Sequence, residues 1–548
     1  MRCNAAMLVA SAAVLAFACP GNALTRAVAA KSLEPGVSSA DMQSGNVNSV
    51  VIDRNEIPPL SCNRVLAWMA GGVSNSRLTI LVQQHGVAFA ANGDARELLK
   101  EAGADVGLVN AIARYSGKEA ASCSAKLGNA ASLVRHNHYK DAEPILRAQL
   151  EDVSAQKDSA ASALHFALGY VRQQQGDWDE AFDEYSDAKA LLPAFPETHS
   201  RLAYDFYISL DGDNTIAEAR TALSLDPQNA EAYRDLGLGL YVDAKYDAAV
   251  FALRKSIALQ PDNPDAYFAM GLTFRRQQKP ERAIAAYRKA LRLNADSWRA
   301  HDEIGRTLLE QKKLGAAIRE FKIAKLISPN EASIRADLGD AYVANHDYDA
   351  AIFELRTLFR IHPDWKTGHT CLAQAFMAKH EYEAALPEFR LALREDPTAA
   401  TRHQAFGEAL LLAHHAHEAV QELRTAILLD PDSASAHHAL GTAFYGDDAW
   451  EQALAEFQQA LRLHPSAQNY YSLAACLMSL GQYSAALSEL NMAVALNPRE
   501  DVYRTRKQEL IRLMRASGGV AREISSVIPD PSGADANGRD GGTVNSQK

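Results

Sequence analysis

Histidines are the residues of this sequence whose spacing most strongly suggests chemistry. Six of the seventeen lie between His403 and His438, and they include the cluster His414, His415 and His417. Imidazole nitrogens bind zinc and other transition metals, so such a cluster could form part of a metal site. No H-E-x-x-H or C-x-x-C pair accompanies it, however, and the cluster falls in a polar stretch between two apolar runs. We therefore expect a turn at this cluster and predict no metal ligands.

Other catalytic motifs are also absent from the sequence. It contains no phosphate-binding glycine loop and no nucleophile elbow. The 56 basic residues are outnumbered by 67 acidic residues, for a net charge of −11. Because nucleic acids and anionic membranes attract proteins through a basic excess, neither is an expected partner. We predict a protein that is not an enzyme, has no catalytic residues and needs no cofactor.

Residues 1–30 have the features of a secretory signal peptide. Arg2 supplies one positive charge, and an uninterrupted apolar stretch follows from Ala5 to Ala18. As a helix this stretch covers about 21 Å, which is less than the roughly 30 Å hydrocarbon core of a bilayer. Cleavage is possible after Ala18, Ala23 or Ala30. We expect an exported protein, periplasmic or secreted.

Two alternatives would keep the chain at a membrane. The apolar stretch could remain as an anchor, or Cys19 could carry a lipid. Lipidation is disfavoured because Ala16 stands where a lipoprotein signal usually has leucine. No other segment is apolar enough to cross a bilayer, so we expect no membrane span in the mature chain.

The next part of the chain divides into a flexible linker, residues 31–56, and a small helical module, residues 57–117. The module contains four short amphipathic runs separated by glycines. Its strings GGVSNSRLTILVQQHGVAF, LLKEAGA and LVNAIARY resemble a module found at the N-terminus of many exported bacterial repeat proteins. Cys62 and Cys123 could form a disulfide if this module folds back onto the segment that follows it, and the sequence leaves that pairing open.

From residue 118 onwards the sequence repeats with a period of 34. In most repeats an apolar residue precedes a glycine or alanine, an alanine follows twelve residues later, and a large apolar residue follows four residues after that; the repeat ending at Pro227 departs from this pattern. Gly305, Ala317 and Phe321 are one such set. The small residue lets two helices approach closely, and proline ends the second helix. These prolines, of which one is replaced by Ala295, are Pro193, Pro227, Pro261, Pro329, Pro363, Pro397, Pro431, Pro465 and Pro498.

This pattern closely resembles the tetratricopeptide repeat. The resemblance implies an all-α fold, a right-handed α-solenoid of about eleven helix-turn-helix repeats. We assign the array to residues 118–498, with a degenerate first repeat at 118–156. An amphipathic capping helix at 499–516 follows it, and a polar, disordered tail at 517–548 ends the chain.

Some residues that could do chemistry are expected to pack in this array instead. His403 and His437 hold the place in the first helix that tyrosine holds in other repeats. Cys371 and Cys476 lie on first helices three repeats apart, which is too far for a disulfide between them. We expect all four to be core residues.

The resemblance also implies where a partner binds. In the family the first helices line a concave groove, and the second, fifth, ninth, twelfth and thirteenth residues of a repeat face inward. Arginine and aromatic residues at these places suit a protein or an extended, partly acidic peptide. The candidate binding residues are Arg234, Tyr241, Phe268, Arg275, Arg276, Arg299 and Arg306.

We therefore expect a non-catalytic scaffold that binds a protein or peptide in the cell envelope. The alternative is a structural or assembly subunit of an envelope complex that binds through the convex face or through the ends of the array. The sequence indicates neither the identity of the partner nor the oligomeric state.

Overall fold

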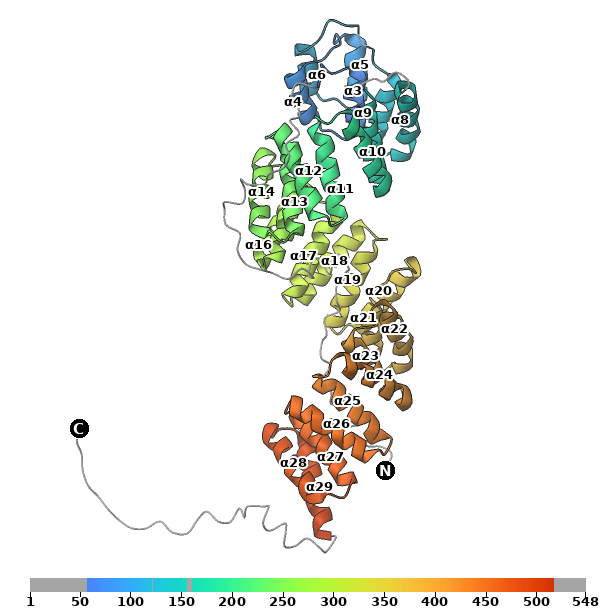
Figure 1. Cartoon of the computed structure of the whole chain (residues 1–548), viewed down its shortest axis with the longest axis vertical. Coiled ribbons are helices and arrows are strands. Elements are labelled where there is room, and N and C mark those ends of the chain that lie inside the picture. Colours follow the sequence, from blue (N-terminus) through green and yellow to red (C-terminus); the bar gives the residue numbers. More distant parts are fainter. Residues whose placement is uncertain (1–56, 121, 155–159, 517–548) are drawn as a thin grey trace, which may run out of the picture. The chain divides into compact units, whose positions relative to one another are not determined.

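The computed structural model describes residues 57–120, 122–154 and 160–516, which form helices α3 to α29 (Figure 1). The predicted signal peptide, linker and C-terminal tail lie outside the described residues. The described chain falls into two compact units, an N-terminal unit of residues 57–334 and a C-terminal unit of residues 335–516.

The N-terminal unit begins with the small module. Its four helices are α3 (Cys62–Ala70), α4 (Asn75–His85), α5 (Gly93–Glu101) and α6 (Val106–Arg114). Each starts at a polar residue whose side chain accepts a hydrogen bond from a backbone N–H in the first turn. These capping residues are Ser61, Ser74, Asn92 and Asp105.

Helical hairpins make up the rest of the N-terminal unit, and we number them as repeats 1 to 6. They are α7 (Ala125–Arg135) with α8 (Tyr139–Ser154), α9 (Ala160–Gln175) with α10 (Trp178–Leu191), α11 (Pro196–Ile208) with α12 (Gly212–Leu225), α13 (Ala230–Val242) with α14 (Tyr246–Leu259), α15 (Pro264–Arg276) with α16 (Pro280–Leu293), and α17 (Trp298–Glu310) with α18 (Leu314–Ile327).

Five more hairpins, repeats 7 to 11, continue the chain, and the division between the two units falls within α19. They are α19 (Ala332–Ala344) with α20 (Tyr348–Ile361), α21 (His369–Ala378) with α22 (Tyr382–Glu395), α23 (Ala400–Leu412) with α24 (Ala416–Leu429), α25 (Ala434–Gly446) with α26 (Trp450–Leu463), and α27 (Ala467–Ser479) with α28 (Tyr483–Leu496). The last helix, α29 (Asp501–Ala516), packs against α28 and buries Leu510 and Met514. The predicted all-α class with about eleven hairpins is confirmed.

The hairpins close where the sequence pattern places small residues. A Cβ added to Gly305 would lie 2.6 Å from the ring of Phe321, which is fully buried with Ala317. The same close approach recurs between Gly237 and Leu253 and between Gly407 and Leu423. The two helices of a repeat therefore touch through a glycine, and a side chain there would separate them.

Tight turns join the two helices of each repeat. In many repeats one residue of the turn adopts a left-handed backbone conformation, and His414 does so with φ 64°. This residue follows α23, and His415 precedes α24. His414 and His415 thus lie in the turn, as their sequence surroundings predict, whereas His417 is the second residue of α24.

None of the helices in the described part of the chain combines the length and the hydropathy needed to cross a lipid bilayer.

Candidate functional site

The face of the first helices that carries the second, fifth, ninth, twelfth and thirteenth residues of each repeat is called the inner face below. In repeat 2 the small module covers it. Helix α3 packs against α7 and α9, and Figure 1 shows α3 beside α9. A Cβ on Gly71 would lie 2.6 Å from Phe166, and one on Gly72 would lie 2.5 Å from Tyr170. These two aromatic residues hold the fifth and ninth places of repeat 2, so the module occupies that part of the inner face.

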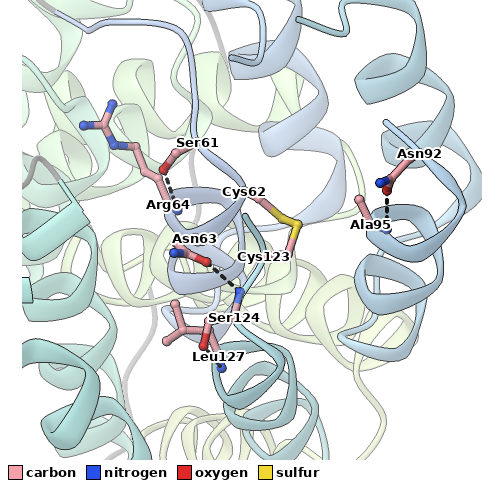
Figure 2. Close-up of a disulfide and its surroundings, with 9 residues drawn as sticks. All are labelled: Ser61, Cys62, Asn63, Arg64, Asn92, Ala95, Cys123, Ser124 and Leu127. Atoms are coloured by element: carbon pink, nitrogen blue, oxygen red, sulfur yellow. Dashed lines mark hydrogen bonds between the residues drawn. A yellow bond between two sulfur atoms is a disulfide. The ribbon is translucent and has the colours of Figure 1, made fainter. Parts of the chain in front are cut away.

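A disulfide fastens the module to repeat 1. Cys62 in α3 bonds to Cys123, just before α7, with the two Cα atoms 5.2 Å apart (Figure 2). Beside it the backbone N–H of Ser124 donates to the Asn63 side chain at 2.8 Å. The structure thus settles the pairing that the sequence left open. It also shows what the pairing does, because the two links hold α3 at the start of the array.

The module reaches repeat 3 through Arg77 of α4. This guanidinium forms ion pairs with Glu197, at the second place of repeat 3, and with Asp226 at 2.6 Å. Burial raises the pKa of Glu197, although Arg77 acts in the opposite direction. Trp68 adds an apolar contact, since its ring stacks on Phe195 with centroids 4.3 Å apart. Together these contacts cover inner-face positions of repeats 2 and 3.

Arg234 is the first of the predicted binding residues along the chain, and it is buried. Its guanidinium lies 2.7 Å from the carboxylate of Asp235, which has no exposed surface. The same guanidinium lies over the ring of Tyr204, 5.5 Å from its centroid. The side chain therefore already has an anion and an aromatic ring from its own chain.

Arg275 and Arg306 are held in a similar way, and they share one carboxylate. Each lies 3.2 Å from a carboxylate oxygen of the buried residue Glu303. Arg275 also pairs with Glu310 at 2.8 Å, and Arg306 pairs with Asp302 at 3.1 Å. Arg275 thus joins the first helices α15 and α17, whereas Arg306 pairs with carboxylates of its own helix, α17.

The other predicted binding residues form fewer polar contacts within the chain. Arg276 is half-buried, and its Nε donates to the hydroxyl of Tyr241 at 3.3 Å. Arg299 is exposed and lies over the ring of Trp298, 5.4 Å from the centroid. Within the described residues neither arginine forms an ion pair. Phe268 is half-buried and packs against Tyr287, with ring centroids 5.6 Å apart.

Buried acids accompany the arginines on the inner face. Burial raises the pKa of Asp205 to about 7, although Arg201 and a hydrogen bond from Gln173 lower it. Burial likewise raises the pKa of Asp235 to about 6, against the opposing effect of Arg234. One oxygen of each carboxyl is buried without a hydrogen-bond partner in the described chain. These groups can therefore hold protons near neutral pH.

One repeated contact was not anticipated from the sequence. A histidine in the first helix forms a hydrogen bond or ion pair with a glutamate nineteen residues later in the second helix of the same repeat. His403 and His437 do this at 2.7 and 2.6 Å, so they link helices and do not merely fill the place of tyrosine. The recurrence of His and Glu nineteen residues apart in the sequence could have predicted this contact. The pairs are His165–Glu184, His199–Glu218, His301–Glu320, His369–Glu388, His403–Glu422 and His437–Glu456.

Metal binding was considered for the histidines of the turn. His415 lies 3.1 Å from Glu383 and 3.9 Å from Glu418. Among the described residues no three His, Cys, Asp or Glu side chains gather in the way that a metal ion needs.

Comparison with known proteins bears on these hairpins. The family model for the tetratricopeptide repeat matches residues 127–196, 268–332, 336–400, 405–467 and 438–501. No curated protein matches the sequence.

Several solved structures are similar at low identity. MamA from Desulfovibrio magneticus RS-1 (residue 41 to the end) is 19% identical over 30% of this chain and 94% of its own, with a TM-score of 0.30. PilF from Pseudomonas aeruginosa is 21% identical over 41% of this chain and 96% of its own, with a TM-score of 0.32. Yeast Tom70 is 13% identical over 72% of this chain and 97% of its own, with a TM-score of 0.31.

The family assignment rests on the matched segments, which cover more than half of the chain and coincide with the observed hairpins. The chain therefore belongs to the tetratricopeptide repeat family.

Proposed function

We propose that this protein is a non-catalytic scaffold of the cell envelope, which binds a segment of a partner protein on the inner face of repeats 4 to 6. The described residues form the small module and the tetratricopeptide hairpins, a fold that typically mediates protein interactions. No described segment is left for a separate catalytic domain. The signal-like residues 1–30 and the disulfide support export, because disulfides persist in oxidising compartments.

The observation that carries the binding site is the difference among the inner-face arginines. Arg234, Arg275 and Arg306 are paired with carboxylates of their own chain. Arg276 and Arg299 form no ion pair in the described chain, and Tyr241 lies beside Arg276. An acidic side chain of a partner would pair with these two arginines without displacing an internal contact.

Repeats 1 to 3 contribute differently to this function. The module already covers Phe166, Tyr170 and Glu197 on their inner face. We propose that the partner site begins at repeat 4, because the contacts of the module described above reach repeats 1 to 3.

Affinity capture from the exported fraction of the source cells tests this function. The mature chain, residues 31–548, would be immobilised beside an Arg276→Glu/Arg299→Glu variant. An Arg282→Glu/Arg319→Glu variant, altered at exposed arginines of α16 and α18, is the matched control. A partner kept by the control and lost by the inner-face variant supports the proposal. Capture that is equal for all three proteins, or no capture, contradicts it.

A further inference from the structure

A second set of basic residues lies on the second helices. In seven consecutive repeats an exposed cation directly follows a buried residue of the second helix, which is Ala219 in repeat 3 and a large apolar or aromatic residue in the other six; we call these seven cations the outer row. Three residues earlier, on the same exposed side, the residue type varies, with Phe353, Pro387 and Gln421 in successive repeats. Exposure alone therefore does not require a cation at this place. The outer row is Arg220, Arg254, Arg288 and Lys322 in the N-terminal unit and Arg356, Arg390 and Arg424 in the C-terminal unit.

In the C-terminal unit each arginine of the outer row lies over an aromatic ring of the next repeat. Arg356 is 5.1 Å from the ring centroid of Phe376, which is buried in α21. The corresponding distances are 5.6 Å from Arg390 to Phe406 and 5.7 Å from Arg424 to Phe444. A guanidinium stacked on a ring is restrained in orientation while it keeps its charge and its N–H donors. The three arginines are therefore preorganised and remain exposed.

Few carboxylates of the chain compete for these arginines. Arg390 forms an exposed ion pair with Glu418 at 3.2 Å, whereas Arg356 and Arg424 form none within the described residues. Two acids lie near the row, but each is bound by another side chain of the protein. Lys379 binds Asp349 at 2.6 Å, and His437 binds Glu456 at 2.6 Å.

Hollows with apolar walls adjoin two members of the row. One, of about 320 Å³, runs along α20 between Arg356 and Arg360, and its wall includes Phe353, which is 65% exposed. The other, of about 340 Å³, lies beside Arg424 and is lined by Ile427 and Phe444. Each hollow thus combines an exposed cation with apolar surface.

We propose that Arg356, Arg390 and Arg424 bind an extended acidic segment of a partner protein that also carries apolar side chains. The acidic groups would pair with the stacked guanidinium groups, and the apolar side chains would enter the hollows. The row has one arginine per repeat, on second helices that are separated in the chain by one first helix. A peptide with a regularly repeated acidic residue would therefore offer carboxylates to successive arginines.

The arrangement favours a polypeptide over an anionic lipid surface. The outer row has one cation on each second helix, and α20 carries a second exposed arginine, Arg360, in the hollow beside Arg356. The same exposed side of these helices also carries the acids Asp349 and Glu383 in the first turn. An anionic bilayer would be repelled there, while a narrow peptide can follow the row between them.

Fluorescence anisotropy with the mature chain tests this surface. The probe is a labelled (Glu-Leu-Thr)₅ peptide in low salt, compared with the same peptide carrying Gln in place of Glu. Arg356→Glu/Arg390→Glu/Arg424→Glu should weaken binding of the Glu peptide at least tenfold. The three Arg→Lys changes keep the positive charge but remove the planar guanidinium that stacks on the ring. We therefore expect the affinity for the Glu peptide to fall roughly threefold. Unchanged helicity and melting temperature would show that the variants are folded.

The variant Arg282→Glu/Arg319→Glu, changed at exposed arginines outside both sites, is the control and should bind the peptide like the wild type. The inner-face variant Arg276→Glu/Arg299→Glu separates this site from the function proposed above, and loss of binding in that variant alone would place the acidic chain on the inner face and overturn the outer site. Absence of binding by the wild type, equal binding of the Gln peptide, or equal binding by the outer-row variant would also overturn it. So would binding to phosphatidylglycerol vesicles with none to the peptide.

Discussion

Arg275 and Arg306 of the inner face and Arg356 and Arg424 of the outer row use the guanidinium group in opposite ways. On the inner face Arg275 and Arg306 share the buried carboxylate of Glu303. In the outer row Arg356 and Arg424 are exposed, lie over aromatic rings and form no ion pair within the described residues. The same side chain therefore joins helices on one face and presents unpaired charge on the other.

The difference shows that the number of arginines on a face is a poor guide to its charge. A guanidinium next to a carboxylate of its own chain adds little net charge, and a partner would have to break the pair before using it. A guanidinium stacked on a ring has no such cost. Which arginines are available for binding depends on their immediate neighbours.

Release of the small module should produce the largest effect, because the module covers the inner face of repeats 2 and 3. The disulfide closes a loop whose ends are 61 residues apart, and its loss should cost about 4 kcal/mol in the free energy of unfolding. Cys62→Ala, Cys123→Ala and the double variant would be compared by urea unfolding. All three should lose similar amounts, because each breaks the same bond. A double variant that loses the sum of the two single effects would contradict the disulfide.

Neutralising the shared carboxylate should weaken the inner face next most strongly. Glu303→Gln keeps the shape of the side chain but leaves Arg275 and Arg306 with one carboxylate each, from Glu310 and Asp302. We expect a loss of about 2 kcal/mol, since buried guanidinium groups lose their common counter-ion. Urea unfolding measures this loss, and a change below about 0.5 kcal/mol would show that the cluster is not a structural link.

The buried acids predict a pH effect on the inner face. Asp205 titrates near 3.9 when unfolded, and burial raises its pKa to about 7 in the folded chain. Between these values the folded state binds more protons, so stability falls as pH rises. Asp205→Asn cannot titrate and should gain roughly 4 kcal/mol relative to the wild type between pH 4 and pH 8, since each pKa unit corresponds to about 1.4 kcal/mol. Urea unfolding of both proteins at several pH values tests this, and parallel curves would contradict it.

The smallest effect is expected at the outer row. Glu418→Gln removes the partner of Arg390, and both side chains are about half exposed, at 51% and 52%. An exposed ion pair of this kind contributes less than about 0.5 kcal/mol. The same chemical change should therefore cost several times less here than at Glu303. Equal losses at the two sites would remove the distinction between the faces.

Much of the fold could be predicted from the repeat pattern alone. The spacing of Gly305, Ala317 and Phe321 predicts a hairpin with a close helix crossing, and the structure has that crossing. The turn at His414 was likewise predictable from polar residues between two apolar runs. The His–Glu spacing and the cations of the outer row are also visible in the sequence. Their roles could not be assigned from it, because those roles depend on which side chains are exposed and which are in contact.

The candidate site was less predictable, because its contacts join separate helices. Glu303 pairs with Arg275 of the preceding repeat, and Cys62 pairs with Cys123 across the whole module. Such pairs depend on how one hairpin stacks on the next and on where the module folds back. No local spacing in the sequence contains that information.

The repeat pattern alone specifies the helices, their turns and the places where the two helices of a hairpin touch. It does so because the same small and large residues recur every 34 residues and pack against each other within each hairpin. Only the tertiary structure decided that the module covers the start of the inner face and that Arg234, Arg275 and Arg306 are already paired. It also decided that arginines of the outer row lie on rings of the next repeat. These outcomes depend on distances between residues far apart in the chain, which helical periodicity does not specify.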